Sequence, residues 1–185
     1  MIIDVAEVRS FELIVPMRHN YCNAPTQNHE RTEMIGKLLE FLEIDSETKA
    51  SASVLSDVLT PHIDDVIERF YKRVRDFDID AHVTDQVLPG LKAKQKQHWM
   101  GLFHSQFQEE YFASVRRIGM RHHNIALSPM WYVAGYMWLK LAFIEVIIRS
   151  DIPAVTKGHL VKTLDKYIAI DMALALSTYN AVILD

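Results

Sequence analysis

The sequence predicts an all-α protein, and three observations lead to this prediction. The 185 residues include only 6 glycines and 6 prolines, so few positions break a helix. No stretch alternates apolar and polar residues for long with the period of two that is typical of a strand. A capping residue followed by proline recurs where new periodic segments start, as at the beginning of many helices. We therefore expect helices joined by short loops.

Residues 1–28 are expected to form an irregular lead, because they show few periodic apolar positions. Residues 29–185 are long enough for one domain with a sizeable core and short for two. A first helix is expected over about Glu30–Glu43. Asp45 or Ser46 then caps a second helix, which ends at Leu59.

The middle of the chain contains two further helix signals. Thr60 followed by Pro61 is an N-cap with proline at the first helical position, and it opens a helix to about Asp76. The stretch DFDIDAHVTDQ is predicted to form a loop or short turns. A fourth helix starts near Pro89 and ends near His104.

Three more helices complete the chain. One spans about Gln106 to His123. Ser128 caps the next, which continues to Arg149, and Asp151 with Pro153 opens a last helix of roughly thirty residues in the same way. The last two helices are longer than the typical ~11–12 residues and are apolar around much of their circumference. Such helices usually bury more than one face, which predicts a partner chain.

Composition excludes several classes of protein. The chain is 49% hydrophobic and 24% charged with a formal net charge of −4, which is typical of a soluble globular protein and argues against a nucleic-acid binder. The single cysteine, Cys22, excludes an internal disulfide, a four-cysteine zinc site and a covalent haem attachment.

Targeting and membrane signals are also missing from the pattern. The first fifteen residues carry Asp4, Glu7 and Arg9 among apolar residues, unlike a signal peptide. Charged residues interrupt both long apolar runs: Lys140 in one, and Asp171 in the run Ile168–Leu184. We expect a cytoplasmic protein that does not span a membrane.

Two adjacent histidines near the end of the fifth predicted helix differ in the side to which they point. Tyr111, Val115, Ile118 and His122 follow i, i+4, i+7, i+11 spacing, which places His122 on the buried stripe. His123 is turned away by about 100° and is expected in solvent. From periodicity alone, His122 is either a core histidine bonded to a carbonyl or a ligand to a metal.

Two other helices supply faces that can lie opposite His122. Tyr71 flanks the stripe of the third helix; by itself it is either a core-edge residue with its hydroxyl in water or a donor to a ligand. The two faces consist of Ile63, Ile67, Phe70 and Val74 on the third helix and of Leu88, Leu91, Gln95, His98 and Leu102 on the fourth.

These three faces together match the needs of an open-sided iron site for a small diatomic gas. Such a site has one neutral imidazole on the iron, a largely apolar opposite wall that leaves one position free, and a hydrogen-bond donor for the gas. Other metal chemistries lack their motifs, since the chain has neither the Glu-x-x-His pairs of a di-iron carboxylate protein nor the H-E-x-x-H of a zinc protease.

The stretch RRIGMRHHNIALSPMWYVAGY resembles the proximal segment of the globin-coupled sensors, whose pattern reads roughly R-I-G-x-x-H-x-x-I-G-L-x-P-x-W-Y. Ala126 departs from it, because the family usually has glycine there. IGMRHH also resembles the related archaeal protoglobins, and IERFYKRV and LKAKQKQHWMGLF are similar to the sensors' distal helices. The resemblance runs from about Glu30 to the C-terminus. The matching positions are Arg117, Ile118, Gly119, His122, Ile125, Leu127, Pro129, Trp131 and Tyr132.

The resemblance implies a globin fold with an extra N-terminal helix and a non-covalently bound haem b. It assigns His122 as the proximal iron ligand and Tyr71 as the phenol that contacts the gas, worth about 1–2 kcal/mol of binding. It also implies that Tyr132 touches the proximal histidine and orients its ring. The remaining implied haem contacts are Phe70, Leu91, Trp99, Val115, Ile118, Ile125, Leu127 and Trp131.

The second distal contact is left open by the resemblance. The family often has leucine or a small hydroxyl residue near Lys94 and Gln95, and this chain has neither there. Gln95 can donate a second hydrogen bond to the gas, and Lys94 can swing toward a haem propionate. His98 is a further candidate for contact with the haem or the iron when no gas is present.

The family function is a haem-based gas sensor, with oxygen as the expected ligand and carbon monoxide or nitric oxide as alternatives. Ligand state is expected to pass through a homodimer interface made by the last two helices to a C-terminal output module. We expect no catalytic residues, since any enzymatic output belongs to such a module. The alternatives are a single-domain haem globin and a non-haem regulatory interaction module. A peroxidase-like enzyme is disfavoured because a distal His-Arg pair is missing.

Overall fold

The computed structural model describes residues 24–181 and the side chains of residues 32–178, so the expectation for most of residues 1–28 lies outside the described residues. Within this part of the chain all regular structure is helical, which confirms the predicted class. The helices are α1 (Ala24–Phe41), α2 (Ser46–Leu59), α3 (Ile63–Asp76), α4 (Leu88–Phe103), α5 (Glu109–Asn124), α6 (Pro129–Arg149) and α7 (Ala154–Ala181), with a 3-10 turn over Thr60–His62.

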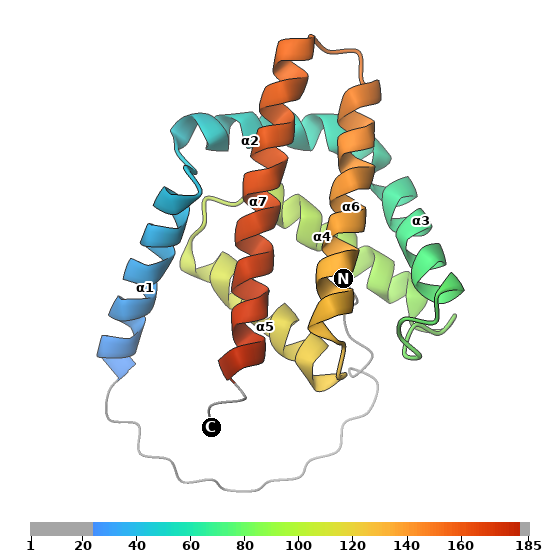
Figure 1. Ribbon diagram of the computed structural model, residues 1–185, viewed down its shortest axis with the longest axis horizontal. Coiled ribbons are helices and arrows are strands. Elements are labelled where there is room, and N and C mark those ends of the chain that lie inside the picture. Colours follow the sequence, from blue (N-terminus) through green and yellow to red (C-terminus); the bar gives the residue numbers. More distant parts are fainter. Residues whose placement is uncertain (1–23, 182–185) are drawn as a thin grey trace, which may run out of the picture.

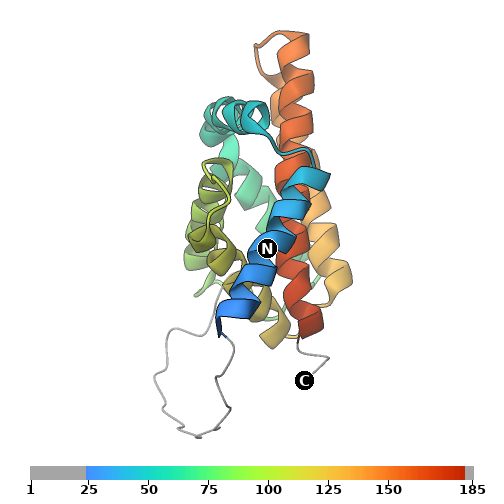
Figure 2. The ribbon, with the colours of Figure 1, turned by 90° about the vertical axis from the view of Figure 1, so that its left-hand side faces the viewer.

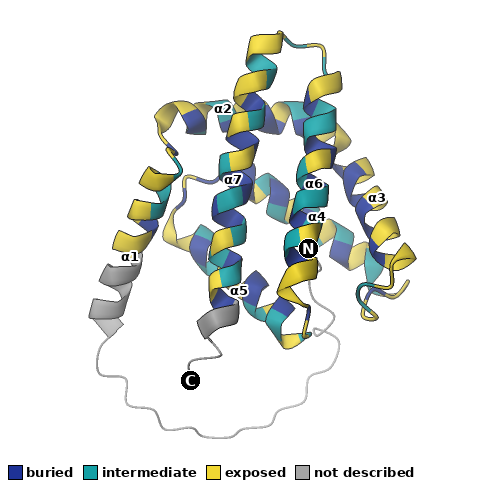
Figure 3. Cartoon of the chain, viewed as in Figure 1, coloured by how far each residue is buried: buried dark blue, intermediate teal, exposed yellow. Residues whose placement is uncertain are grey.

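The helices form two layers. The antiparallel pair α6 and α7 makes one layer, and α2 to α5 lie behind it (Figure 1). The view turned by 90° shows the same separation (Figure 2). Helix α7 packs against α5, α6 and α2, and α3 packs against α4 and α6. The buried residues gather on the facing sides of the layers, and the outer sides of α1, α3 and α6 carry many exposed ones (Figure 3).

Two of the predicted helix caps are confirmed. The Asp45 carboxylate accepts a hydrogen bond from the backbone N–H of Thr48 at 2.8 Å, and α2 starts at the next residue. The Ser128 hydroxyl accepts from the N–H of Met130 at 3.3 Å, with Pro129 as the first residue of α6. Each side chain satisfies one backbone donor that the first helical turn leaves without a partner.

The predicted N-cap at Thr60 is wrong. Its hydroxyl donates to the carbonyl of Ser56 at 2.7 Å, one turn back along α2. The backbone remains helical through Thr60 and passes through the 3-10 turn into α3. A threonine hydroxyl can bond forward to an N–H or backward to the carbonyl four residues earlier, and sequence does not distinguish the two cases.

Three helix boundaries differ from the prediction. Helix α1 begins at Ala24, six residues before Glu30. Helix α5 begins at Glu109 because Phe107 adopts a left-handed backbone with φ of 58°, which interrupts a helical path from Gln106. Helix α7 begins at Ala154, so Pro153 precedes the helix and Asp151 is too far from it to be its N-cap. The predicted loop between α3 and α4 is confirmed as a series of turns.

Helices α5 and α7 approach closely at Gly119. A Cβ atom added there would lie 2.3 Å from the Thr178 hydroxyl oxygen and 2.4 Å from the Ala175 carbonyl oxygen. Any side chain would therefore collide with the backbone of α7, so glycine is required by packing. This contact lies one turn before His122 and holds that part of α5 against α7.

Helix α6 is both apolar and only partly covered. It passes a length-and-composition test for a membrane-spanning helix, with a mean hydropathy of 1.4 and 33% of the tested stretch buried; core helices of soluble proteins pass the same test. Lys140 on α6 pairs with Asp165 at 2.9 Å, and Glu145 lies 3.6 Å from Arg69. That the chain does not span a membrane remains a prediction.

Candidate functional site

His122 lies in the last turn of α5 and is fully buried, as its helical face predicts. Its Nδ1 atom lies 2.8 Å from the carbonyl oxygen of Ile118. A carbonyl can only accept, so Nδ1 carries the proton and Nε2 carries the lone pair in this tautomer. His123 is half-buried, so the prediction of a fully solvated residue is only partly correct.

The surroundings of His122 keep its ring neutral. Burial lowers the pKa of this imidazole to about 3, far below its usual 6.5. A neutral ring with a fixed Nδ1 proton presents Nε2 as a potential metal ligand. The two alternatives left open by the sequence thus coexist, because the carbonyl bond occupies one nitrogen and leaves the ligand role to the other.

Tyr132, at the start of α6, packs edge-on against His122 with 5.0 Å between the ring centres. Its hydroxyl donates to the hydroxyl of Tyr136 at 3.0 Å. This ring contact agrees with the family resemblance, which implies that Tyr132 touches His122. The partner that Nδ1 bonds at 2.8 Å is a backbone carbonyl, a contact that the resemblance did not indicate.

Tyr71 and Phe70 are both buried on the inner side of α3, with 5.4 Å between their ring centres. The interpretation of Tyr71 as a core-edge residue with its hydroxyl in water is therefore wrong. Burial, with a contribution from the Asp80 carboxylate, raises the pKa of this phenol well above its usual 10. Tyr71 therefore keeps its proton and remains a hydrogen-bond donor.

Gln95 is the most unusual residue of α4. Its side chain is fully buried, and neither its Oε1 nor its Nε2 atom has a hydrogen-bond partner in the structure. Buried amides are almost always bonded, so an unpartnered one indicates a missing water, ion or ligand. Leu91 and Trp99 lie one turn to either side and are equally buried. The predicted face of α4 is therefore correct at Gln95 and extends to Trp99.

A cleft of about 710 Å³ opens between α4 and α5, within the range of about 300–1,000 Å³ that is usual for ligand pockets. Of the predicted site residues, Lys94, His98 and Ile118 line it. Arg117 and Arg121 add positive charge to its α5 wall. The cleft does not include Tyr71, Gln95 or His122, so the structure divides the predicted site between an open cleft and a closed interior.

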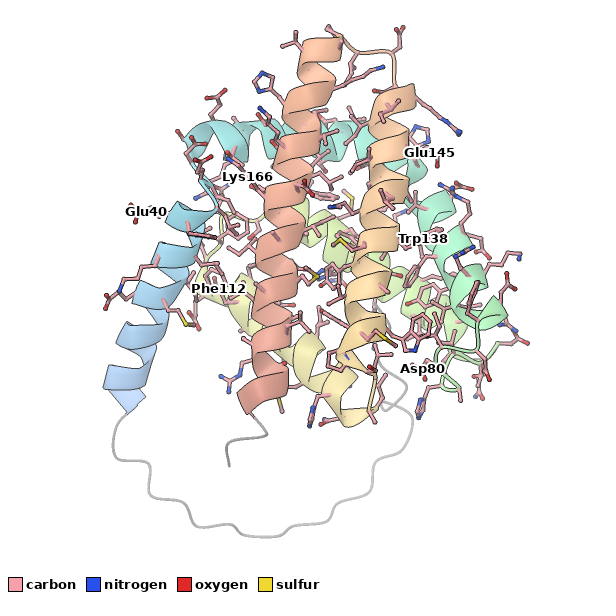
Figure 4. All side chains as sticks on the ribbon, in the orientation of Figure 1. Glu40, Asp80, Phe112, Trp138, Glu145 and Lys166 are labelled. Atoms are coloured by element: carbon pink, nitrogen blue, oxygen red, sulfur yellow. The ribbon has the colours of Figure 1, made fainter. Side chains whose placement is uncertain are left out.

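The remaining predicted haem contacts lie partly in the interior and partly at a separate groove. Val115 and Leu127 are buried, and Ile125 is half-buried. Trp131 is more than a third exposed and lines a separate apolar groove of about 160 Å³ together with Phe70 and Trp138. Trp138 lies between α6 and α3, with its ring centre 5.8 Å from that of Phe70 (Figure 4). The side chain of Trp131 thus lines this groove and not the cleft between α4 and α5.

His98 already has a partner inside the protein. Its Nε2 atom lies 2.9 Å from Oδ2 of Asp171, a fully buried residue of α7. Tyr111 and Tyr136 donate to the same carboxylate at 2.5 and 2.7 Å. The sequence reasoning did not include Asp171 in the site. The one available signal is that Asp171 interrupts an apolar run, which indicates either an exposed residue or a buried one with partners.

Comparisons with known proteins place this geometry in context. The family model described as Protoglobin matches residues 32–182. The chain is 25% identical over 154 residues to the heme-based aerotactic transducer HemAT of Halobacterium salinarum, an alignment that covers 76% of this chain and 31% of the transducer. The chain thus spans about a third of the length of that relative.

Solved structures show the same fold. The globin domain of a Geobacter sulfurreducens globin-coupled sensor superposes with a TM-score of 0.72 at 14% identity, covering 78% of this chain and 96% of that domain. The globin domain of E. coli DosC was solved in a ferric and a ferrous form. Each form superposes with a TM-score of 0.65 at 22% identity, covering 78% of this chain and 99% of the DosC domain. These similarities confirm the predicted globin fold.

Proposed function

The chain belongs to the protoglobin family, and from this premise we propose that it is a haem-based gas sensor domain with haem b as its cofactor and oxygen as its ligand. The observation that carries the proposal is the buried, neutral His122, whose Nδ1 proton is fixed by a carbonyl so that Nε2 could hold the haem iron. Globin haem is held by one such proximal histidine.

The other residues of the site fit the cofactor. Lys94, Arg117 and Arg121 line the cleft between α4 and α5 and can pair with the propionates of a haem that enters there. The apolar neighbours Leu91, Trp99 and Val115 suit the porphyrin face. Tyr71, Gln95 and His122 do not line the open cleft, so our proposal includes a separation of α4 and α5 when haem is taken up.

The distal residues are suited to bind a polar ligand. A bound ferrous haem would supply an iron with affinity for a diatomic gas. Tyr71 keeps a hydroxyl proton in an apolar interior, and Gln95 holds an amide without a partner. Both can donate to a ligand that carries partial negative charge, and oxygen gains more from such donors than carbon monoxide does.

A homodimer built on α6 and α7 is part of this proposal. Met130, Leu141 and Ile148 of α6 and Val155 near the start of α7 are exposed apolar residues on these two helices. Exposed apolar surface of this kind commonly forms an interface, and a two-fold contact buries the same surface on both subunits. The aerotactic transducer is about three times as long as the aligned segment, which is consistent with a signal that passes from this domain to an output module. We further propose that the sensor is cytoplasmic.

The proximal assignment can be tested with the two adjacent histidines. His122→Ala is expected to be purified without the Soret band of the wild type, and added imidazole should restore it. His123→Ala is the matched control and should keep the wild-type spectrum. Circular dichroism would establish that both variants remain helical. A wild-type Soret band in His122→Ala, without imidazole, would contradict the proximal role.

The dimer can be tested independently of the haem. Leu141→Glu places a charge on the exposed face of α6 and should shift sedimentation from dimer to monomer. Phe41→Glu, on an even more exposed apolar residue of α1, is the control and should leave the dimer intact. A monomeric wild type with an intact Soret band would favour the alternative of a single-domain haem globin.

A further inference from the structure

Asp171 is a buried carboxylate that joins four helices. It lies on α7, and Oδ2 accepts from His98 on α4 at 2.9 Å and from Tyr136 on α6 at 2.7 Å. Oδ1 accepts from Tyr111 on α5 at 2.5 Å. We call these four residues the Asp171 cluster. A buried carboxylate is unfavourable unless hydrogen bonds satisfy it, and these three donors provide them.

The cluster extends to the wall of the cleft at one end. His98 and Tyr111 both line the cleft between α4 and α5, one from each wall. Each is tied to Asp171 by a direct hydrogen bond. A ligand or cofactor that moves either wall therefore acts on the Asp171 carboxylate.

The other end of the cluster leads to His122. The Tyr136 hydroxyl, which donates to Asp171, accepts from the Tyr132 hydroxyl at 3.0 Å. The ring of Tyr132 lies edge-on to His122 at 5.0 Å. A continuous line of contacts thus runs from Oδ2 of Asp171 through two tyrosines to the imidazole, whereas the bond at Oδ1 leads to Tyr111.

We propose that Asp171 is a positioning residue that holds Tyr136, and through it Tyr132, against His122, and so couples the orientation of this imidazole to the cleft wall and to α7. The readout through iron rests on the proposed function, because it requires His122 to be the axial ligand. The side chain acts through Tyr136 and Tyr132 and contacts neither haem nor gas. The two carboxylate oxygens have different roles, Oδ2 in positioning and Oδ1 in anchoring α5.

The two tyrosines make a matched pair for the test. Tyr136→Phe and Tyr111→Phe each remove one hydroxyl that donates to the same carboxylate, and each keeps its ring. In the ferrous, haem-loaded protein, resonance Raman spectroscopy should show a shifted iron–histidine stretching band in Tyr136→Phe and in Asp171→Asn. Tyr111→Phe should keep the wild-type band. An unshifted band in Tyr136→Phe, or an equal shift in Tyr111→Phe, would overturn the proposal.

A second arm keeps the test valid if the protein takes up no haem. That result would end the proposed function but leave the cluster open to measurement in the haem-free chain. The ring resonances of His122 in NMR spectra should then shift in Tyr136→Phe and remain in place in Tyr111→Phe. Asp165→Asn, on the exposed side of α7 and paired with Lys140, should change nothing. Equal shifts in both tyrosine variants, or none in either, would show that Asp171 has only a structural role.

Discussion

The two sides of the candidate site differ in how completely their polar groups are satisfied. On the α5–α7 side, Nδ1 of His122 is bonded to a carbonyl, and all three donors around Asp171 have direct bonds to it. On the α3–α4 side, both polar atoms of the Gln95 side chain are buried without a partner. The polar groups of His122 and Asp171 are thus bonded within the protein, whereas the Gln95 amide retains unused hydrogen-bonding capacity.

This difference indicates that the α5–α7 side is suited to hold a cofactor and the α3–α4 side is suited to recognise a ligand. A residue that must hold a cofactor in one orientation benefits from bonds that already exist before the cofactor arrives. A residue that must recognise a ligand needs capacity that the protein itself does not use, and an unpartnered buried amide reduces stability in the absence of the ligand. The comparison predicts that substitutions on the α5–α7 side destabilise the fold, whereas selected ones on the α3–α4 side stabilise it.

The largest effect is expected for Gly119→Ala. The new methyl group would meet the α7 backbone at 2.4 Å and push α5 away, so the free energy of unfolding should fall by about 3 kcal/mol. Urea unfolding followed by circular dichroism measures this change. Gly158→Ala, in an exposed part of α7 with nothing within 4 Å, should instead gain about 0.5–1 kcal/mol. Similar effects of the two variants would refute a packing requirement at position 119.

Asp171→Asn should have the next largest effect, lowering the free energy of unfolding by about 2 kcal/mol at neutral pH because the charge-assisted hydrogen bonds are lost. Burial alone would raise the pKa of Asp171, but the attraction of His98 and the bonds from His98, Tyr111 and Tyr136 outweigh it and keep the pKa below its usual 3.8.

The pH dependence follows from the sign of that shift. A carboxyl whose pKa is lower in the folded state contributes its full stability above the unfolded value of 3.8 and loses it as the pH falls through the folded value. The difference between wild type and Asp171→Asn should therefore be present above about pH 4 and shrink as the pH falls further into acid. Urea titrations at several pH values test this expectation, and a difference unchanged at acid pH would contradict it.

Local signals in the sequence predicted most of the helices, because caps and proline act within one turn. Asp45 and Ser128 behave as their types predict, and the helical spacing around His122 correctly identified its buried face. Thr60 shows the limit of such signals, since its hydroxyl has two local options with similar sequence patterns. The left-handed Phe107 likewise has no signal in its residue type.

The sequence could not predict contacts that depend on how distant helices meet. Asp171 receives its bonds from residues 35 to 73 positions away in the chain, so its role becomes visible only in the folded molecule. The sequence identified Gly119 only as part of a motif. The reason that glycine is required there is that any side chain would clash with Ala175 and Thr178 in another helix. The sequence also left open whether Gln95 or Lys94 makes the second distal contact. The folded structure separates the two residues, because Gln95 is buried and Lys94 lines the cleft.

A stabilising effect is expected on the other side of the site. Gln95→Leu replaces two buried atoms without partners by an apolar group of similar size, so the haem-free protein should gain about 1–2 kcal/mol. Gln97→Leu, at an exposed position in the same helix, is the control and should change stability by less than about 0.5 kcal/mol. Urea unfolding of the haem-free proteins compares the two. A loss of stability in Gln95→Leu would show that the amide is satisfied in solution and would remove the contrast between the two sides.

Tyr71→Phe removes a single hydroxyl, so it tests gas recognition with little effect on folding. Tyr71→Phe keeps the ring that packs against Phe70 at 5.4 Å and removes the donor. A hydrogen bond to a polarised ligand is worth about 1.4 kcal/mol, so oxygen should dissociate roughly tenfold faster from the haem-loaded variant. Carbon monoxide, which is less polarised, should show a much smaller change and serves as the internal control. Stopped-flow measurement of both gases decides the matter: equal acceleration would indicate a loosened pocket, and unchanged oxygen dissociation would leave Gln95 as the donor on this side.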